Sequence, residues 1–160
     1  AAPAGYIVVF RGLIDKAESA EEVAGVLGHE MGHVIERHGT EGLIRAQGMR
    51  FIFGAMAEGG ALDYGALLLT FSYGRDAERE ADRIGVTMLN RANIRGAGMV
   101  GFFRRIGKDD ASSPGMSRYF STHPPSGERA TEIEARAAGK GEAMTQEEWR
   151  ALRAICSEKS

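Results

Sequence analysis

Two histidines and a glutamate form the clearest chemical pattern of the chain, in His29-Glu30-Met31-Gly32-His33. Residues i and i+4 share one face of a helix, so the two imidazoles can reach the same metal ion. Glu30 lies about 100° around the helix from His29 and remains available to hold and deprotonate a water molecule. The pattern predicts a catalytic metal site with Glu30 as general base.

The third metal ligand must come from another part of the chain. Structural zinc sites usually have four protein ligands that include cysteine, whereas catalytic sites have three and keep one position open. The single cysteine, Cys156, is far from the motif in sequence. A metzincin would carry a glycine and a histidine where this chain has Glu36 and Gly39, which excludes that arrangement.

The next charged segment offers two acids, Glu78 and Asp82, at helical i, i+4 spacing. Their face of the helix also carries Ala81, Gly85 and Leu89. Burial of an unpaired carboxylate is costly, and a metal ion would compensate that cost. We assign Glu78 to the metal and Asp82 to a hydrogen bond that orients a ligand histidine, His29 in the simplest case. The alternative is a solvated helix face on which Arg75 and Arg79 pair with the acids.

Two further residues are candidates for the chemistry. His123 stands before Pro124 and Pro125, a stiff position from which an imidazole can donate to a developing oxyanion. Arg129 can add positive charge to the same site. In isolation, a loop-packing histidine and a surface arginine are the more frequent alternatives. His38 is interpreted as a residue at a helix C-terminus, where an imidazolium favours the helix dipole.

Both ligand-bearing segments are expected to be helices. Ser19, with Glu22 as its capping-box partner, begins a helix that runs to about His38 and stops at Gly39. Residues 75–92 form the second helix. The first one also carries a stripe of Gly25, Gly28 and Gly32. Because each mid-helix glycine costs about 1 kcal/mol relative to alanine, the stripe predicts close approach of another helix.

The remaining elements follow from local patterns. Tyr6–Phe10 predicts a β-strand, whose partners must come from elsewhere, including sequence before Ala1. Other helices are expected over residues 41–57, Leu62–Phe71, 96–107, from Pro124-Pro125 to about Ala138, and after a capping box of Thr145 and Glu148.

Composition limits the class of protein. With 160 residues, 43% hydrophobic and 26% charged, the chain fits one globular domain, residues 1–160. The net charge of −2 has no long run of one sign, so nucleic acid is not an expected partner. No run of about 18 apolar residues predicts a transmembrane span, although proximity to a membrane stays open. No targeting signal is visible in the sequence.

Four motifs in order resemble the gluzincin zinc metallopeptidases of the CAAX prenyl protease, HtpX and BepA type, nearest to the soluble, BepA-like members. The motifs are Gly5–Val9 followed by Arg11-Gly12-Leu13, the pentapeptide 29–33, Gly74–Asp82, and His123-Pro124 with Arg129. Gly74 replaces the serine of the family pattern. The resemblance implies one Zn²⁺ per chain and these site residues: His29, His33 and Glu78 on the metal, with Glu30, His123 and Arg129 in catalysis.

The implied fold is α+β, a mostly helical zincin-like domain in which two helices cross at the metal beside a small N-terminal β-sheet. The expected function is zinc-dependent endopeptidase activity in protein quality control of the cell envelope, in the periplasm or at a membrane. Its substrates would be polypeptides, among them misfolded envelope proteins, lying as extended strands against residues 1–10. Alternatives are a chaperone-like, client-binding module with a latent or vestigial metal site, and a purely structural metal domain. Residues 40–72 are either a lid over the site or a packed helix pair.

Overall fold

A computed structural model describes residues 5–54, 74–109, 119, 122–123 and 127–155, and this part of the chain is mostly helical. The helices are α1 (Arg11–Lys16), α2 (Ala20–Ile35), α3 (His38–Gly54), α5 (Arg75–Arg91), α6 (Ala97–Asp109), α8 (Gly127–Arg136) and α9 (Gln146–Ile155). None of these helices has the length and apolar character that a membrane crossing requires.

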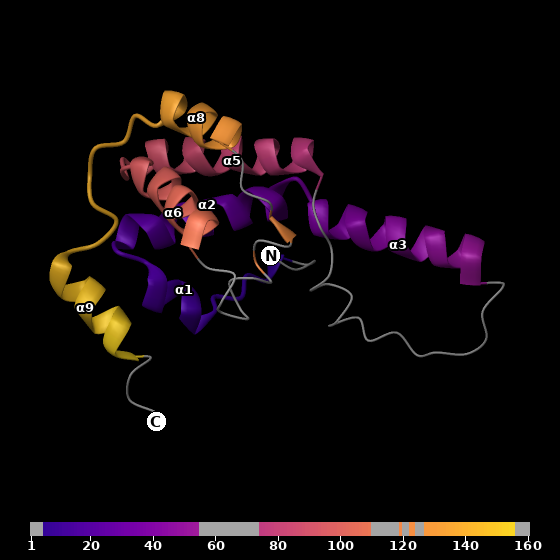
Figure 1. Ribbon diagram of the computed structural model, residues 1–160, viewed down its shortest axis with the longest axis horizontal. Coiled ribbons are helices and arrows are strands. Elements are labelled where there is room, and N and C mark those ends of the chain that lie inside the picture. The colour runs from indigo at the N-terminus through magenta and orange to yellow at the C-terminus, as the bar shows by residue number, and fades with distance from the viewer. Residues whose placement is uncertain (1–4, 55–73, 110–118, 120–121, 124–126, 156–160) are drawn as a thin grey trace.

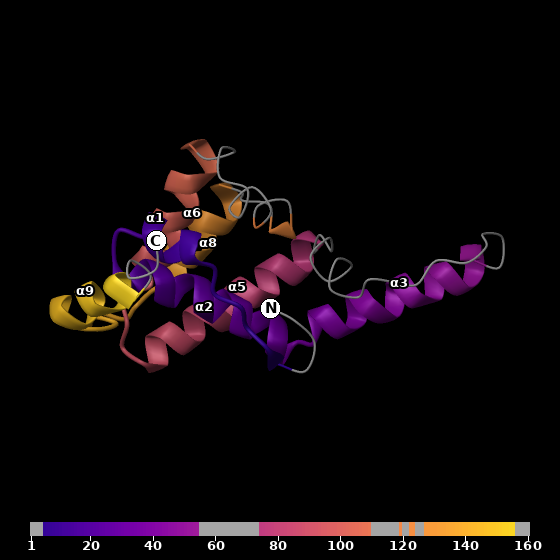
Figure 2. The ribbon, with the colours of Figure 1, turned by 90° about the horizontal axis from the view of Figure 1, so that it is seen from below.

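Helix α2 is the centre of the fold and packs against both α5 and α6, while α8 covers α5 and α6 (Figure 1). The core between them is made of apolar side chains that are almost fully enclosed, among them Val26, Val86, Met99, Phe102 and Ile133. Helix α3 extends away from this group and α9 lies at the opposite end, as two perpendicular views show (Figures 1 and 2).

The predicted glycine stripe lies where the helices touch. A Cβ atom on Gly32 would be 2.5 Å from the carbonyl oxygen of Ala81, and one on Gly28 would be 3.3 Å from that of Gly85. Gly25 makes an equally close approach to α6. The expectation of a close helix on this stripe is therefore confirmed, and it brings the backbones of α2 and α5 together beside the ligand residues.

The predicted capping box is complete at α9 and only half formed at α2. At α9, Glu148 N donates to Thr145 Oγ1 at 3.3 Å and Thr145 N donates to Glu148 Oε2 at 2.8 Å, which completes the expected box. At α2, Ser19 Oγ accepts from Glu22 N at 3.3 Å. The Glu22 carboxylate, however, accepts from Glu18 N at 2.8 Å instead of returning to Ser19.

The first ligand helix is shorter than predicted. It ends at Ile35, Arg37 takes a φ of +57°, and His38 begins α3. A left-handed residue after the last turn ends a helix and redirects the chain, a role usually filled by glycine. Gly39, expected to be that breaking residue, instead lies inside α3. The placement of His38 at a helix C-terminus was therefore wrong.

The small N-terminal sheet is not seen in the described part of the chain. Tyr6–Phe10 forms no strand. Among all the residues that the structure describes, the sole β-type pairing is an isolated parallel bridge between Ile94 and Gly141. Tyr6 and Val8 are 72% and 66% exposed. A single β-prone segment without a paired neighbour forms no ladder, which explains the failure of the prediction. Leu62–Phe71 and residues 55–72 of the lid candidate lie outside the described residues.

Candidate metal centre

Three donor groups from α2 and α5 converge where these helices cross. Nε2 of His29 and Nε2 of His33 are 3.0 Å apart. Glu78 of α5 places Oε1 3.2 Å from His33 Nε2 and Oε2 3.5 Å from His29 Nε2. All three side chains are at most 2% exposed. The structure thus brings the three predicted metal ligands to one buried point.

His123 joins this group from the other side. Its Nδ1 lies 2.9 Å from Glu78 Oε1 and 3.2 Å from His29 Nε2. With His33, these residues place four donor atoms within 4.8 Å of one another. His123 is tied to Tyr119, because its own N–H and the hydroxyl of Thr122 both donate to the carbonyl of Tyr119, each at 2.9 Å. The residue expected to be an oxyanion donor therefore also lies within reach of a metal as a ligand.

The donor set fits a divalent metal ion. His29 Nδ1 lies 2.8 Å from Asp82 Oδ1, which places the imidazole proton on Nδ1 and leaves the lone pair of Nε2 facing His33. Buried imidazole lone pairs and a carboxylate oxygen that face one point favour a cation between them. Ligands on tetrahedral zinc, at about 2.0–2.1 Å from the metal, are separated by about 3.3 Å. The separations of 3.0–3.5 Å among His29, His33 and Glu78 agree with that value.

Asp82 links the ligand histidine to α8. Besides the contact with His29, it accepts from Arg129 Nε at 2.6 Å and from Arg129 Nη2 at 2.9 Å. Burial opposes ionisation of Asp82, but the hydrogen bonds from His29 and Arg129 hold its pKa below the ordinary value. Asp82 is therefore a carboxylate in position to fix the tautomer and the ring direction of His29.

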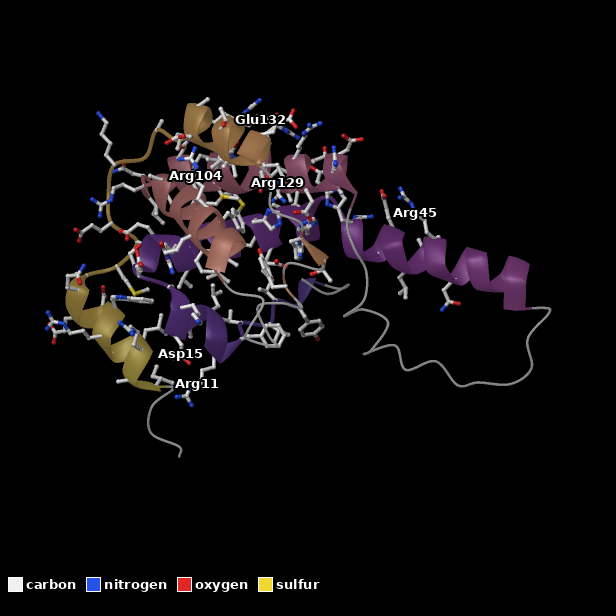
Figure 3. All side chains as sticks on the ribbon, viewed as in Figure 1. Arg11, Asp15, Arg45, Arg104, Arg129 and Glu132 are labelled. Atoms are coloured by element: carbon white, nitrogen blue, oxygen red, sulfur yellow. The ribbon has the colours of Figure 1, made fainter. Side chains whose placement is uncertain are left out.

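Arg129 reaches from α8 towards α5 (Figure 3). Its Nη1 lies 2.6 Å from Glu78 Oε2, and its guanidinium stands 5.7 Å from the ring centre of Phe103. Arg129 therefore contacts the two buried carboxylates of α5, Glu78 and Asp82, as well as the ring of Phe103 in the core. A stabilising effect on the developing oxyanion, which the resemblance implied, stays a proposal for this residue.

Glu30 lies beside the ligand group without belonging to it. The side chain is buried, and Oε1 is 3.5 Å from His123 Nε2. This contact places the predicted base and the predicted oxyanion donor on the same side of the ligand cluster. The geometry agrees with a division of labour in which α2 supplies two ligands and, between them, one proton acceptor.

Two of the expected ligands, His33 and Glu78, are held in the protonation states that metal binding needs. Burial lowers the pKa of His33 to about 4, despite its contact with Glu78. Burial opposes the charge of Glu78, yet hydrogen bonds with His123 and His33 keep its pKa well below the ordinary value. At neutral pH the centre therefore presents a neutral imidazole and an ionised carboxylate, as a metal site requires.

We expect the metal-free protein to lose stability in mild acid. Below pH 6.5 the unfolded chain protonates His33, whereas the folded chain does so only near pH 4, so the free energy of unfolding falls as the pH is lowered. The loss between pH 7.5 and pH 5 should be about 2 kcal/mol in urea unfolding. His33→Gln, which cannot titrate, should show less than half of this loss. An equal pH dependence in both proteins would contradict the assignment.

Sequence reasoning missed two residues of the centre. His38 Nδ1 lies 2.9 Å from His33 Nδ1, and the ring of Tyr119 stacks on His123 with centroids 4.7 Å apart. A possible signal for His38 was its position five residues after a ligand histidine. For Tyr119 the signal was its place four residues before His123, which allows one turn to join them.

Two crossing helices, one with the HExxH pair and one with a glutamate, define the arrangement of gluzincin metallopeptidases. The chain belongs to peptidase family M48, whose profile matches residues 1–137. The expected family resemblance is therefore confirmed.

Three relatives illustrate the match. Mitochondrial metalloendopeptidase OMA1 of Arabidopsis thaliana is 34% identical over 89% of this chain and 30% of its own length. Metalloproteases YcaL and LoiP of Escherichia coli (strain K12) are 33% and 31% identical over 85% and 86% of the chain, each over 57% of its own length. The chain thus spans between about a third and somewhat more than half of these relatives.

Proposed function

We propose that the protein is a zinc-dependent endopeptidase. The observation that carries the proposal is the buried convergence of His29, His33 and Glu78, with Glu30 beside them. Membership of a peptidase family supports it. Zinc accepts both imidazole and carboxylate ligands, and when bound it lowers the pKa of water and polarises a carbonyl group.

The residues then divide the remaining work. His29, His33 and Glu78 hold the ion, and Asp82 keeps His29 in the ligand tautomer. Glu30 takes the proton from the attacking water and passes it to the leaving nitrogen.

His123 has two possible positions in this scheme. In one it is a fourth ligand, as its 2.9 Å contact with Glu78 allows, and in the other it donates to the oxyanion. Peptide hydrolysis requires an open position for water, so the second arrangement is the one that supports turnover. Arg129 adds positive charge beside the same oxyanion and is held there by its contacts with Glu78 and Asp82.

The proposed substrates are extended polypeptides, including misfolded proteins of the cell envelope. Tyr6–Phe10 is a mostly exposed, β-prone segment that follows Gly5, where an added Cβ would lie 3.8 Å from Val34 of α2, and it is a suitable edge for an extended chain. A relative from Vibrio cholerae, 28% identical over 83% of this chain and 31% of its own length, is named putative beta-barrel assembly-enhancing protease. Together with the family resemblance, this name supports a proposed site of action in the periplasm or at a membrane.

Metal dependence tests the proposal directly. The protein as isolated is expected to contain one zinc ion per chain and to hydrolyse casein. Chelation should remove both the metal and the hydrolysis, and one equivalent of zinc should restore both, because the bound ion both lowers the pKa of the attacking water and polarises the carbonyl. Metal content and the release of casein fragments are measured on the same samples.

Other results would favour the alternatives. Binding of unfolded casein without cleavage, unchanged by chelation, would indicate a chaperone-like module. Unfolding on chelation, with no hydrolysis at any zinc concentration, would indicate a structural metal. Either outcome would overturn the proposed activity.

A further inference from the structure

His38 is a buried histidine that the proposed mechanism leaves unused. It is 8% exposed and begins α3, directly after Arg37 with its positive φ. This turn of the chain sends the ring back onto α2, where its centroid is 5.0 Å from that of His33. The two Nδ1 atoms are 2.9 Å apart. The unusual backbone at Arg37 thus has an identifiable result, the contact between these two rings.

Two neutral imidazoles in such a contact need one donor and one acceptor. Nε2 of His33 is the atom that faces the centre, 3.2 Å from Glu78 and 3.0 Å from His29. A metal ligand must offer a lone pair there, so the proton of His33 belongs on Nδ1. His38 Nδ1 is then the acceptor, and the proton of His38 is on Nε2.

We propose that His38 is a positioning residue, which accepts a hydrogen bond from His33 Nδ1 and so keeps His33 Nε2 aimed, with its lone pair, at the metal. The inference rests on the proposed role of His33 as a ligand. It matches the arrangement at the other histidine, where Asp82 receives the Nδ1 proton of His29 at 2.8 Å. Outer partners of this kind fix the tautomer and ring direction of metal-bound histidines.

A carboxylate of α5 completes the chain of contacts. Glu80 Oε2 lies 3.5 Å from His38 Nε2, on the side where the proton of His38 belongs. Because the Glu80 side chain is 43% exposed and the distance exceeds an ordinary hydrogen bond, its effect on the ring should be small. His38 therefore has the main effect on His33, and Glu80 a minor one.

The competing interpretation is that His38 only fills space at the start of α3. In that case the proton could lie on Nε2 of His33, which would donate to Glu78, and His38 would be the donor to His33 Nδ1. The two interpretations predict opposite tautomers for both rings. They also predict different effects when an acceptor is returned to position 38.

The first experiment measures zinc affinity by competition with a chromogenic chelator. His38→Leu keeps the volume but removes the acceptor, and it should weaken zinc binding by about 10- to 100-fold. His38→Asn, whose side-chain oxygen can accept near the former Nδ1, should recover most of the loss. Glu41→Gln, an exposed change in the same turn of α3, should leave the affinity within twofold. A His38→Leu protein with the parent affinity, or an Asn variant as weak as Leu, would overturn the proposal.

The second experiment reads the tautomer of His33 from ring ¹⁵N chemical shifts in the metal-free protein. The parent should show a protonated Nδ1, and His38→Leu should show a mixture of tautomers. A protonated Nε2 in the parent would overturn the inference. Absence of zinc binding by the parent would instead contradict the proposed function, and the tautomer measurement would still decide the role of His38.

Discussion

Replacement of Glu30 by glutamine is expected to lower kcat for peptide hydrolysis by about 1,000-fold while the protein keeps its zinc. Glutamine has the size of glutamate and can still bind a water molecule, but it cannot take a proton from it. The side chain is buried beside His123 and is not one of the converging ligands, so the metal should remain. Hydrolysis of a quenched fluorescent peptide and zinc content by atomic absorption give the two values.

Glu36→Gln is the matched control. It removes one negative charge from the C-cap residue that follows the same helix, six residues from Glu30 in sequence, and should change kcat less than twofold. Retained hydrolysis in Glu30→Gln would remove Glu30 from the role of base. Loss of zinc in that variant would show instead that Glu30 helps to hold the ion.

The spacing within each helix explains how much of the centre the sequence could predict. His29 with His33, and Glu78 with Asp82, are i, i+4 pairs, and this geometry is fixed as soon as a helix forms. The glycine stripe further predicted which side of α2 receives a close neighbour, because side-chain-free positions in a helix are costly without one. Local rules were therefore sufficient to predict that both pairs meet where the two helices cross.

Features that depend on distant contacts or unusual backbone angles could not be predicted in the same way. Arg37 adopts a left-handed backbone conformation, which the sequence does not predict because residues other than glycine rarely adopt it. This conformation places His38 against His33. Tyr6–Phe10 has strand-forming residues, but a strand also needs a partner, and none pairs with it among the described residues. The contacts of Arg129 join residues 47 positions apart, which spacing rules do not cover.

Gly32→Ala is expected to reduce the free energy of unfolding by about 3 kcal/mol. Alanine normally stabilises a helix interior relative to glycine by about 1 kcal/mol, so the expected sign is the reverse of the usual one. The reason is the backbone of α5, because the new Cβ would lie 2.5 Å from the oxygen and 2.7 Å from the Cα of Ala81. No flexible side chain can move aside there, and the two helices must separate. Urea unfolding of the metal-free protein measures the change.

Gly48→Ala in α3 is the opposite case, because, apart from the backbone of its own helix, no atom of the described residues lies within 4 Å of its added Cβ. This variant should be as stable as the parent or slightly more stable.

Gly32→Ala should also affect metal binding, because Ala81 lies one turn from Glu78 and Gly32 precedes His33. Separation of α2 and α5 must then pull these ligands apart, and metal sites tolerate changes of only about 0.2 Å. Gly32→Ala should therefore lose stability and zinc affinity together. A variant that loses neither would show that α2 and α5 do not pack at this distance.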